Sequence, residues 1–390
     1  ADVAVAFRPA MLSVPIVNLE KNPGQQATGR ILVNFAPGNV LTDETIRIDG
    51  PVLNATGTAT FGRGGDLTSL VFPSIRMGPL NDLAFQLRRG PGGNDYTLRG
   101  RSLDGSKIGR NGTGQGANGA HGARPDDTPE GRFHISAQLE RLAMRDGVSI
   151  MPFSMDLTGG GGRPATLALS GAPAQDKGNG AAGAHIGANI VAVPEGRRMT
   201  LTAANAGLLA RGLFAFESMR DGALDATVVL PGRATDTTDP KVPDFTGTLK
   251  VTNFRMVNQS FLARLFSAGS LTGLVDLMGG EGMTLDSLEM PFSSKNNVIS
   301  VNGARVAGPA IGASADGYID RPKGQIALKG SLVPAFALNS FISNVPVIGD
   351  ILASKKGEGI FGVTYSLSGD SEHPDISTNP LAMLTPGILR

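Results

Sequence analysis

The sequence contains no cysteine and no tryptophan, and only 5% of its residues are aromatic. Without cysteine there can be no disulfide bond, no thiolate metal ligand and no cysteine nucleophile. The lack of thiols is compatible with an oxidising compartment. Because large aromatic side chains are scarce, several closed hydrophobic cores would be hard to fill at native packing density.

The sequence also lacks an excess of charge of either sign and lacks long apolar runs. It has 35 basic and 34 acidic residues, which are scattered along the chain and give a formal net charge of +1. No basic stripe with interleaved aromatic residues is present, so we expect no nucleic-acid partner. No apolar run approaches the roughly 18 to 20 residues that a membrane-spanning helix requires.

Residues that carry chemistry do not form a recognisable pattern. The four histidines are not spaced as metal ligands, and no nucleophile elbow or comparable local frame is present. The stretch GTGQGANG is similar to a phosphate-binding glycine loop, but no helix pattern follows it. We therefore expect no metal, no cofactor and no enzymatic activity.

Glycine and alternating apolar residues are abundant instead. The chain has 54 glycines, which is about twice the usual share. Apolar residues recur at period two, as in Leu83, Phe85 and Leu87, and Gly, Asp and Asn clusters separate these runs. This pattern predicts a mainly β protein built as a long, meandering antiparallel sheet.

Changes in composition divide the chain into five segments. We predict a β-rich segment at 1–104, a Gly-rich loop at 105–131, a β-rich segment with a short helix at 132–232, a linker at 233–244, and a C-terminal region at 245–390.

Apolar residues at helical spacing predict a few short amphipathic helices. In the segment 205–221, Leu208, Leu209, Leu213 and Phe216 indicate one helix between strands. Similar stripes occur at 261–278 and 338–352, and they predict helices that cover the sheet.

Three passages resemble the AsmA-like family of envelope proteins. They are NAGLLARGLFAFESMRDGALDATV, FTGTLKVTNFRMVNQSFLARLFSAGSLTGLVDLMGGEGMTLDSLEMPF and SFISNVPVIGDILASKKGEGIFGVTYSLSGDSEHPDISTNPLAMLTPGILR, and the last two cover most of 245–390. The resemblance implies an elongated, curled antiparallel sheet with an apolar groove. It also implies a Gram-negative periplasm, an inner-membrane anchor before residue 1, and transport of phospholipid between the inner and outer membrane. The family has no catalytic residues to carry over.

The alternation in the C-terminal region gives the candidate lipid-binding residues, whose expected partners are phospholipid acyl chains. An outer-membrane or periplasmic protein could be a further partner. The candidate groove residues are Phe245, Leu249, Val251, Leu285, Ile299, Val301, Ile311, Ile319, Ile326, Leu328, Phe361, Val363 and Leu367.

Other interpretations of the same pattern remain open. The alternating residues could fill the ordinary core of a sandwich or barrel. The chain could also be a β-rich scaffold or assembly factor for outer-membrane proteins that binds through an exposed strand edge. An enzyme acting on envelope glycan would need paired carboxylates. Asp286 and Glu289 are expected on opposite faces of one strand, which argues against that activity.

Overall fold

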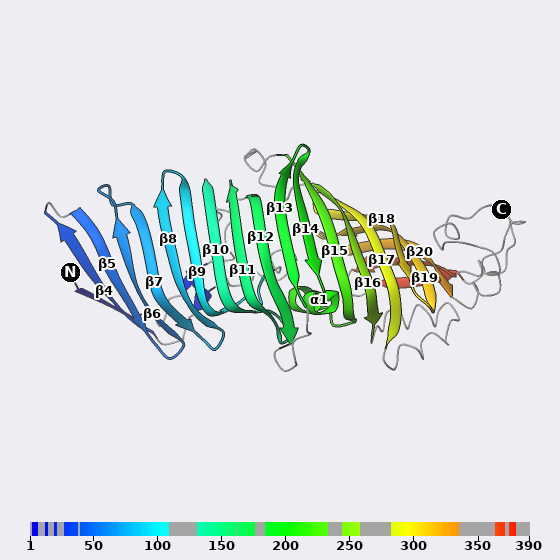
Figure 1. Ribbon diagram of the computed structural model, residues 1–390, viewed down its shortest axis with the longest axis horizontal. Coiled ribbons are helices and arrows are strands. Elements are labelled where there is room, and N and C mark those ends of the chain that lie inside the picture. Colours follow the sequence, from blue (N-terminus) through cyan, green and yellow to red (C-terminus); the bar gives the residue numbers. More distant parts are fainter. Residues whose placement is uncertain are drawn as a thin grey trace, which may run out of the picture.

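The fold is a long β-sheet with one described helix, as seen in a computed structural model of the chain (Figure 1). The structure describes residues 2–6, 12–14, 19–21, 27–37, 40–108, 131–161, 163–175, 184–232, 244–257, 282–334, 363–370 and 374–379.

The main sheet contains 20 strands, and β2 and β3 form a separate two-stranded sheet. The strands are β1 (Asp2–Ala6), β2 (Leu12–Val14), β3 (Leu19–Lys21), β4 (Thr28–Ala36), β5 (Val40–Asp49), β6 (Leu53–Phe61), β7 (Leu67–Met77), β8 (Asn81–Gly90), β9 (Gly93–Asp104), β10 (Arg132–Ala143), β11 (Val148–Gly160), β12 (Arg163–Gln175), β13 (Ile186–Val193), β14 (Gly196–Ala203), β15 (Met219–Pro231), β16 (Phe245–Met256), β17 (Met283–Lys295), β18 (Val298–Ala307), β19 (Ile311–Asp320), β20 (Gln325–Pro334), β21 (Val363–Asp370) and β22 (Asp375–Asn379).

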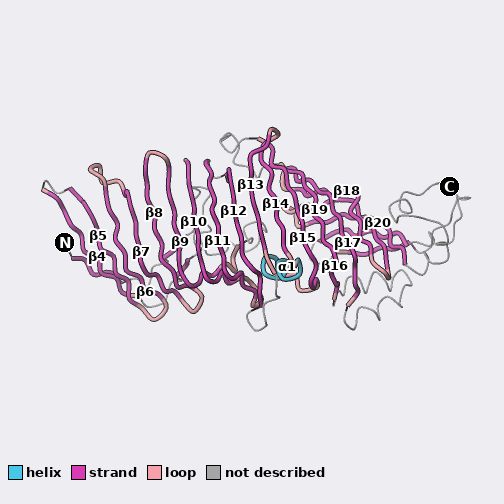
Figure 2. The backbone as a smooth tube through the Cα atoms, viewed as in Figure 1, coloured by secondary structure: helices cyan, strands magenta, loops and turns pink. Residues whose placement is uncertain are grey.

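Strands follow one another in the sheet in the order of the sequence. β1 pairs with β4, and from β4 each strand pairs with the next one as far as β22. The strands stack along the long axis of the molecule, and the sheet twists strongly after β13 (Figures 1 and 2). The predicted fold class, a mainly β protein with an elongated, curled sheet, is confirmed.

One pair departs from the predicted antiparallel arrangement. β9 and β10 run parallel, with Tyr96 opposite Ile135 and Leu98 opposite Ala137. Parallel neighbours need a long connection that returns to the start of the first strand. The Gly-rich stretch 105–131 is long enough for this return, and its residues 109–130 lie outside the described ranges.

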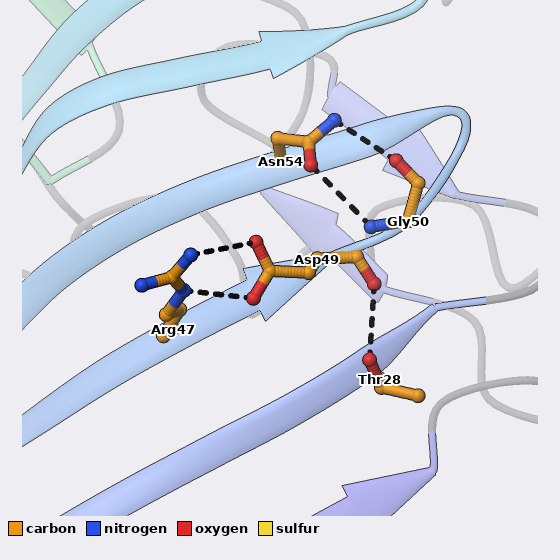
Figure 3. Close-up of polar contacts among 5 residues, drawn as sticks. All are labelled: Thr28, Arg47, Asp49, Gly50 and Asn54. Carbon is orange, nitrogen blue, oxygen red and sulfur yellow. Dashed lines mark hydrogen bonds and ion pairs between the residues drawn. The ribbon is translucent and has the colours of Figure 1, made fainter.

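A connection between antiparallel strands is held by local polar contacts at the N-terminal end of the sheet (Figure 3). Between β5 and β6, the Asn54 amide donates to the Gly50 carbonyl at 2.9 Å. Arg47 Nε donates to Asp49 Oδ2 at 2.8 Å, and Thr28 Oγ1 on β4 donates to the Asp49 carbonyl at 3.3 Å. The hydrogen bond that Arg47 donates to Asp49 raises the pKa of Arg47. These short-range contacts fix where β5 ends and β6 begins.

The helix predicted within 205–221 is present as α1 (Ala206–Phe214). Asn205 caps its N-terminus, since its Oδ1 accepts a hydrogen bond from the Leu208 amide at 2.9 Å. Ala215 adopts a left-handed conformation, with φ of 55°, and ends the helix. Phe216, which the spacing assigns to the apolar stripe, therefore lies beyond the helix and is exposed.

The other two predicted helices, at 261–278 and 338–352, lie outside the described residues. Over the ranges that the structure describes, no helix has the length and apolar character needed to cross a membrane, since α1 has nine residues.

A histidine on β10 links the parallel pair to the next strand. His134 Nδ1 lies 3.3 Å from Asp95 Oδ1 on β9, and His134 Nε2 lies 2.8 Å from Asp156 Oδ2 on β11. The hydrogen bond to Asp156 is the main reason why the pKa of His134 is raised. The imidazolium form thus ties three neighbouring strands together.

We predict that this contact makes stability depend on pH. Because the folded pKa of His134 is raised, its contribution is complete below the unfolded value of 6.5 and is lost as pH rises through the folded value. The side chain is 42% exposed, so the effect should stay below about 1 kcal/mol. Urea unfolding at about pH 5.5 and about pH 8.5 should show His134→Gln less stable than the parent only at the lower pH. Equal differences at both pH values would contradict this role.

Glycine at position 100 allows β8 and β9 to pair closely. A Cβ atom at Gly100 would lie 2.5 Å from Leu83 Cα and 2.6 Å from the Asp82 carbonyl oxygen. The position also faces Leu139 on β10, so a side chain has no free space to enter. We therefore treat Gly100 as a position where the backbone of the neighbouring strand requires glycine.

We predict that Gly100→Ala lowers the free energy of unfolding by about 1 to 3 kcal/mol, because the added methyl group overpacks the strand pair. Gly90→Ala is the matched control, since a Cβ there meets nothing within 4 Å. The control should change stability by less than about 0.5 kcal/mol in urea unfolding. Equal stability of the two variants would contradict this role, because it would show that β8 and β9 can move apart at Gly100 without loss of stability.

Candidate functional site

One face of the sheet is apolar over nearly the whole length of the molecule. In a sheet, residues that are directly opposite each other on neighbouring strands point to the same face. Following these partners from strand to strand gives three continuous rows of side chains. We call the face that carries them the apolar face.

The first row runs from β6 to β22 through Ala59, Leu70, Leu87, Tyr96, Ile135, Leu157, Leu167, Ile190, Met199, Val228, Gly247, Phe292, Val301, Gly317, Leu328, Leu367 and Ile376. The second row runs from β7 to β17 through Phe72, Phe85, Leu98, Ala137, Met155, Leu169, Ala188, Leu201, Ala226, Leu249 and Met290. The third runs from β4 to β21 through Gly29, Ile48, Ala55, Ile75, Leu83, Gly100, Leu139, Phe153, Gly171, Ile186, Ala203, Leu224, Val251, Leu288, Val306, Ala313, Leu332 and Val363.

These rows contain no charged residue, and the hydroxyl group of Tyr96 is their only oxygen-bearing side-chain group. The opposite face, which we call the polar face, has the reverse composition. One row across it from β9 to β22 consists of Arg99, Gln138, Ser154, Ser170, Gly187, Thr202, Asp225, Lys250, Glu289, Arg305, Ser314, Ser331, Thr364 and Asn379. A single sheet thus separates an apolar surface from a hydrophilic one.

The structure brings together most of the candidate groove residues predicted from the sequence. Leu249, Val251, Val301, Leu328, Val363 and Leu367 all belong to the three rows. Four more occupy one further row on the same face, where Phe245 faces Ser294, Ser294 faces Ile299, and Ile319 faces both Ile299 and Ile326.

The remaining three candidates differ in position. Ile311 lies two residues before Ala313 on β19 and so shares the apolar face. Leu285 faces Phe254 on β16, and both side chains pack in the same buried cluster as Val251 and Val363. Phe361 lies outside the described residues.

Burial divides these candidates into two groups. Val251, Leu285, Val301, Ile311, Val363 and Leu367 are buried, with exposed fractions between 0% and 6%. Phe245, Leu249, Ile299, Ile319, Ile326 and Leu328 are half-buried. The first group is packed within the chain, so a ligand on this face would contact the second group.

The N-terminal half of the apolar face was not among the predicted site residues. Residues from Leu53 on β6 to Ala203 on β14 form a buried cluster, with Leu157, Leu169 and Leu201 half-buried against it. The alternation of Leu83, Phe85 and Leu87 was a usable signal. This alternation shows that the strand has one apolar face, but it does not show which strands lie beside it. Whether this face continues into the C-terminal region depends on the strand register.

One buried charge lies beside the first row of the apolar face. Arg197 lies on β14 two residues before Met199 of the first row, and it is 3% exposed. Its Nη1 donates to the Pro164 carbonyl, while its Nε has no hydrogen-bond partner among the described residues. Burial lowers the pKa of Arg197, and the nearby Arg163 lowers it further. The burial of the charged Arg197 guanidinium on this face therefore costs free energy.

No group of three or more His, Asp or Glu side chains in the described ranges could hold a metal ion. Glu289 and Lys250 are direct cross-strand partners on the polar face, and Glu289 Oε1 lies 3.2 Å from Lys250 Nζ. Such a pair of opposite charges stabilises the contact between the two strands. The side chains of Asp286 and Glu289 are both exposed on β17.

Comparison of the chain with protein-family models, with curated proteins and with solved structures gives no match. The candidate site therefore rests on the geometry of the sheet.

We predict that Arg197→Met keeps or raises the free energy of unfolding, by up to about 1 kcal/mol, because it removes a desolvated charge and retains the side-chain volume. Arg198→Met on the same strand is the control. Its guanidinium is exposed and lies 3.2 Å from Glu195, so the change should stay within about 0.5 kcal/mol. A loss of more than about 1 kcal/mol in Arg197→Met would show that the buried charge stabilises the fold.

Proposed function

We propose that this chain is a non-enzymatic lipid-transport protein, in which phospholipid acyl chains lie on the apolar face and move along it between the inner and outer membrane. The single observation that supports this most is the continuity of the three rows. The first row reaches β22, the third reaches β21 and the second ends on β17, and none of them contains a charged residue.

The physical argument concerns the cost of exposing an acyl chain to water. Each exposed CH₂ group costs about 0.8 kcal/mol, so an acyl chain in water costs about 10 kcal/mol or more. A row of Leu, Ile, Val, Met and Phe side chains replaces this water contact. Because the rows have no charged side chain, no step along them requires an acyl chain to desolvate a charge.

The direction of the rows also supports transport rather than simple storage. The rows run across the strands and therefore along the long axis of the molecule (Figure 1). At about 4.8 Å between strands, the 20 strands span about 90 Å. A surface of this length suits movement over a distance much greater than the length of one lipid.

The proposed compartment rests on the resemblance to the AsmA-like family. The AsmA-like family implies a Gram-negative periplasm, and a chain without cysteine is compatible with that compartment. The polar face would then meet the aqueous periplasm, since its row from Arg99 to Asn379 consists of charged residues, hydroxyl and amide side chains and one glycine.

We predict that photo-crosslinking side chains on the apolar face capture phospholipid. Leu167 and Leu328 are half-buried members of the first row, and their neighbours Ala168 and Lys329 are exposed on the polar face. A crosslinker at Leu167 or Leu328 should yield lipid adducts in the producing cells, detected by mass spectrometry. A crosslinker at Ala168 or Lys329 should yield none.

Two results would count against the proposal. One is lipid capture from Ala168 and Lys329 at the level of Leu167 and Leu328. The other is a purified chain whose organic extract contains no phospholipid. Capture of a protein instead of lipid would favour the assembly-factor alternative.

A further inference from the structure

A pocket with a volume of about 240 Å³ lies beside α1. Its walls come from α1 and its cap, from the first residues of β15, from the end of β12 and from Arg255 on β16. α1 follows β14 directly and packs mainly on β15, near the middle of the long sheet (Figure 1). The pocket thus lies about midway along the sheet.

The charges in this pocket do not balance. Among the described lining residues, Arg211, Arg220 and Arg255 contribute three positive charges and Asp221 contributes the only negative one. Arg255 Nη2 lies 2.8 Å from Asp221 Oδ2, so this carboxylate is already paired. Neither Arg211 nor Arg220 has a hydrogen bond or ion pair from its side chain to any described residue. Among the described residues, these two guanidinium groups therefore have no counter-charge.

Strand register places two of these charges against each other. Arg220 on β15 is the direct cross-strand partner of Arg255 on β16. Like charges at directly opposite positions destabilise a strand pair. The backbone is also unusual here, with left-handed φ values of 58° at Asp221 and 54° at Asn253. Non-glycine residues in this conformation are uncommon, and they concentrate at functional sites.

The uncharged part of the pocket connects it to the apolar face. Leu208 packs against the N-terminal buried cluster, which extends from Leu53 to Leu209. Met219 packs against the C-terminal cluster, which contains Val251 and Val363. The lining of the pocket therefore contacts both clusters, through Leu208 and Met219, and also includes three arginines.

We infer that this pocket binds a phosphate group, and that the phosphate belongs to an amphipathic ligand whose acyl chains lie on the apolar face. Guanidinium groups bind phosphate oxygens through paired, charge-assisted hydrogen bonds. A bound phosphate would compensate Arg211 and Arg220 and would separate Arg220 from Arg255. The lipid source of the phosphate rests on the proposed function, whereas the anion site itself rests on the charges of the pocket.

The test compares ligands that differ only in the phosphate group. Isothermal titration calorimetry of the full chain would use dihexanoylphosphatidylglycerol, dihexanoylglycerol and inorganic phosphate as separate probes. We expect the phospholipid to bind at least about tenfold more tightly than the diacylglycerol. The double variant Arg211→Gln/Arg220→Gln should lose this preference and keep its affinity for the diacylglycerol.

The matched control is Arg89→Gln/Arg99→Gln, which removes the same charge from exposed positions on β8 and β9. It should keep the preference for phospholipid, and an equal loss in the control would overturn the inference. Equal affinity of the parent chain for both lipids would also overturn it and would leave the proposed function standing. Binding of inorganic phosphate alone, lost in Arg211→Gln/Arg220→Gln, would support the anion site and overturn the lipid source.

Discussion

The structure depends on one constraint, which is that apolar alternation must stay in register from each strand to the next. A shift of one residue in any pair would turn that strand's apolar side chains to the polar face. The pairs Leu87–Tyr96, Met199–Val228 and Leu328–Leu367 come from distant parts of the chain, yet they fall in one row. The continuity of the apolar face is therefore a property of the whole set of pairings.

The sheet accommodates this constraint by local irregularities that leave the faces intact. In β18, Val301 and Ala304 are separated by a bulge, and both are buried on the apolar face. Bulges increase the local twist of a strand and can restore its register. At Gly100 the lack of a side chain lets β8 and β9 approach closely. The sheet can thus twist strongly after β13 while its rows continue.

Charges are distributed according to the same division. Exposed pairs such as Lys250–Glu289 and the contacts of His134 lie on the polar face, where each contributes little to stability. Exceptions occur beside the apolar side chains. Arg197 is buried with no described partner for its Nε, and Arg211 and Arg220 line a pocket whose described side chains carry excess positive charge. Elsewhere the fold keeps charged side chains away from the apolar surface. At these arginines a charged side chain lies beside apolar ones.

The sequence by itself determined the fold class, because period-two alternation with frequent turn residues is compatible with few structures other than a meandering sheet. It also determined α1, through the spacing of Leu208, Leu209 and Leu213, and it assigned Val301, Leu328 and Val363 correctly to one face. The sequence did not reveal the parallel pairing of β9 and β10, the N-terminal half of the apolar face, or the pocket beside α1. Alternation shows that a strand has one apolar and one polar face. Only the pairing of neighbouring strands decides which apolar faces lie side by side in the sheet. Arg211, Arg220 and Arg255 are separated along the chain, and the tertiary structure alone brings them together, because register and helix packing are long-range properties.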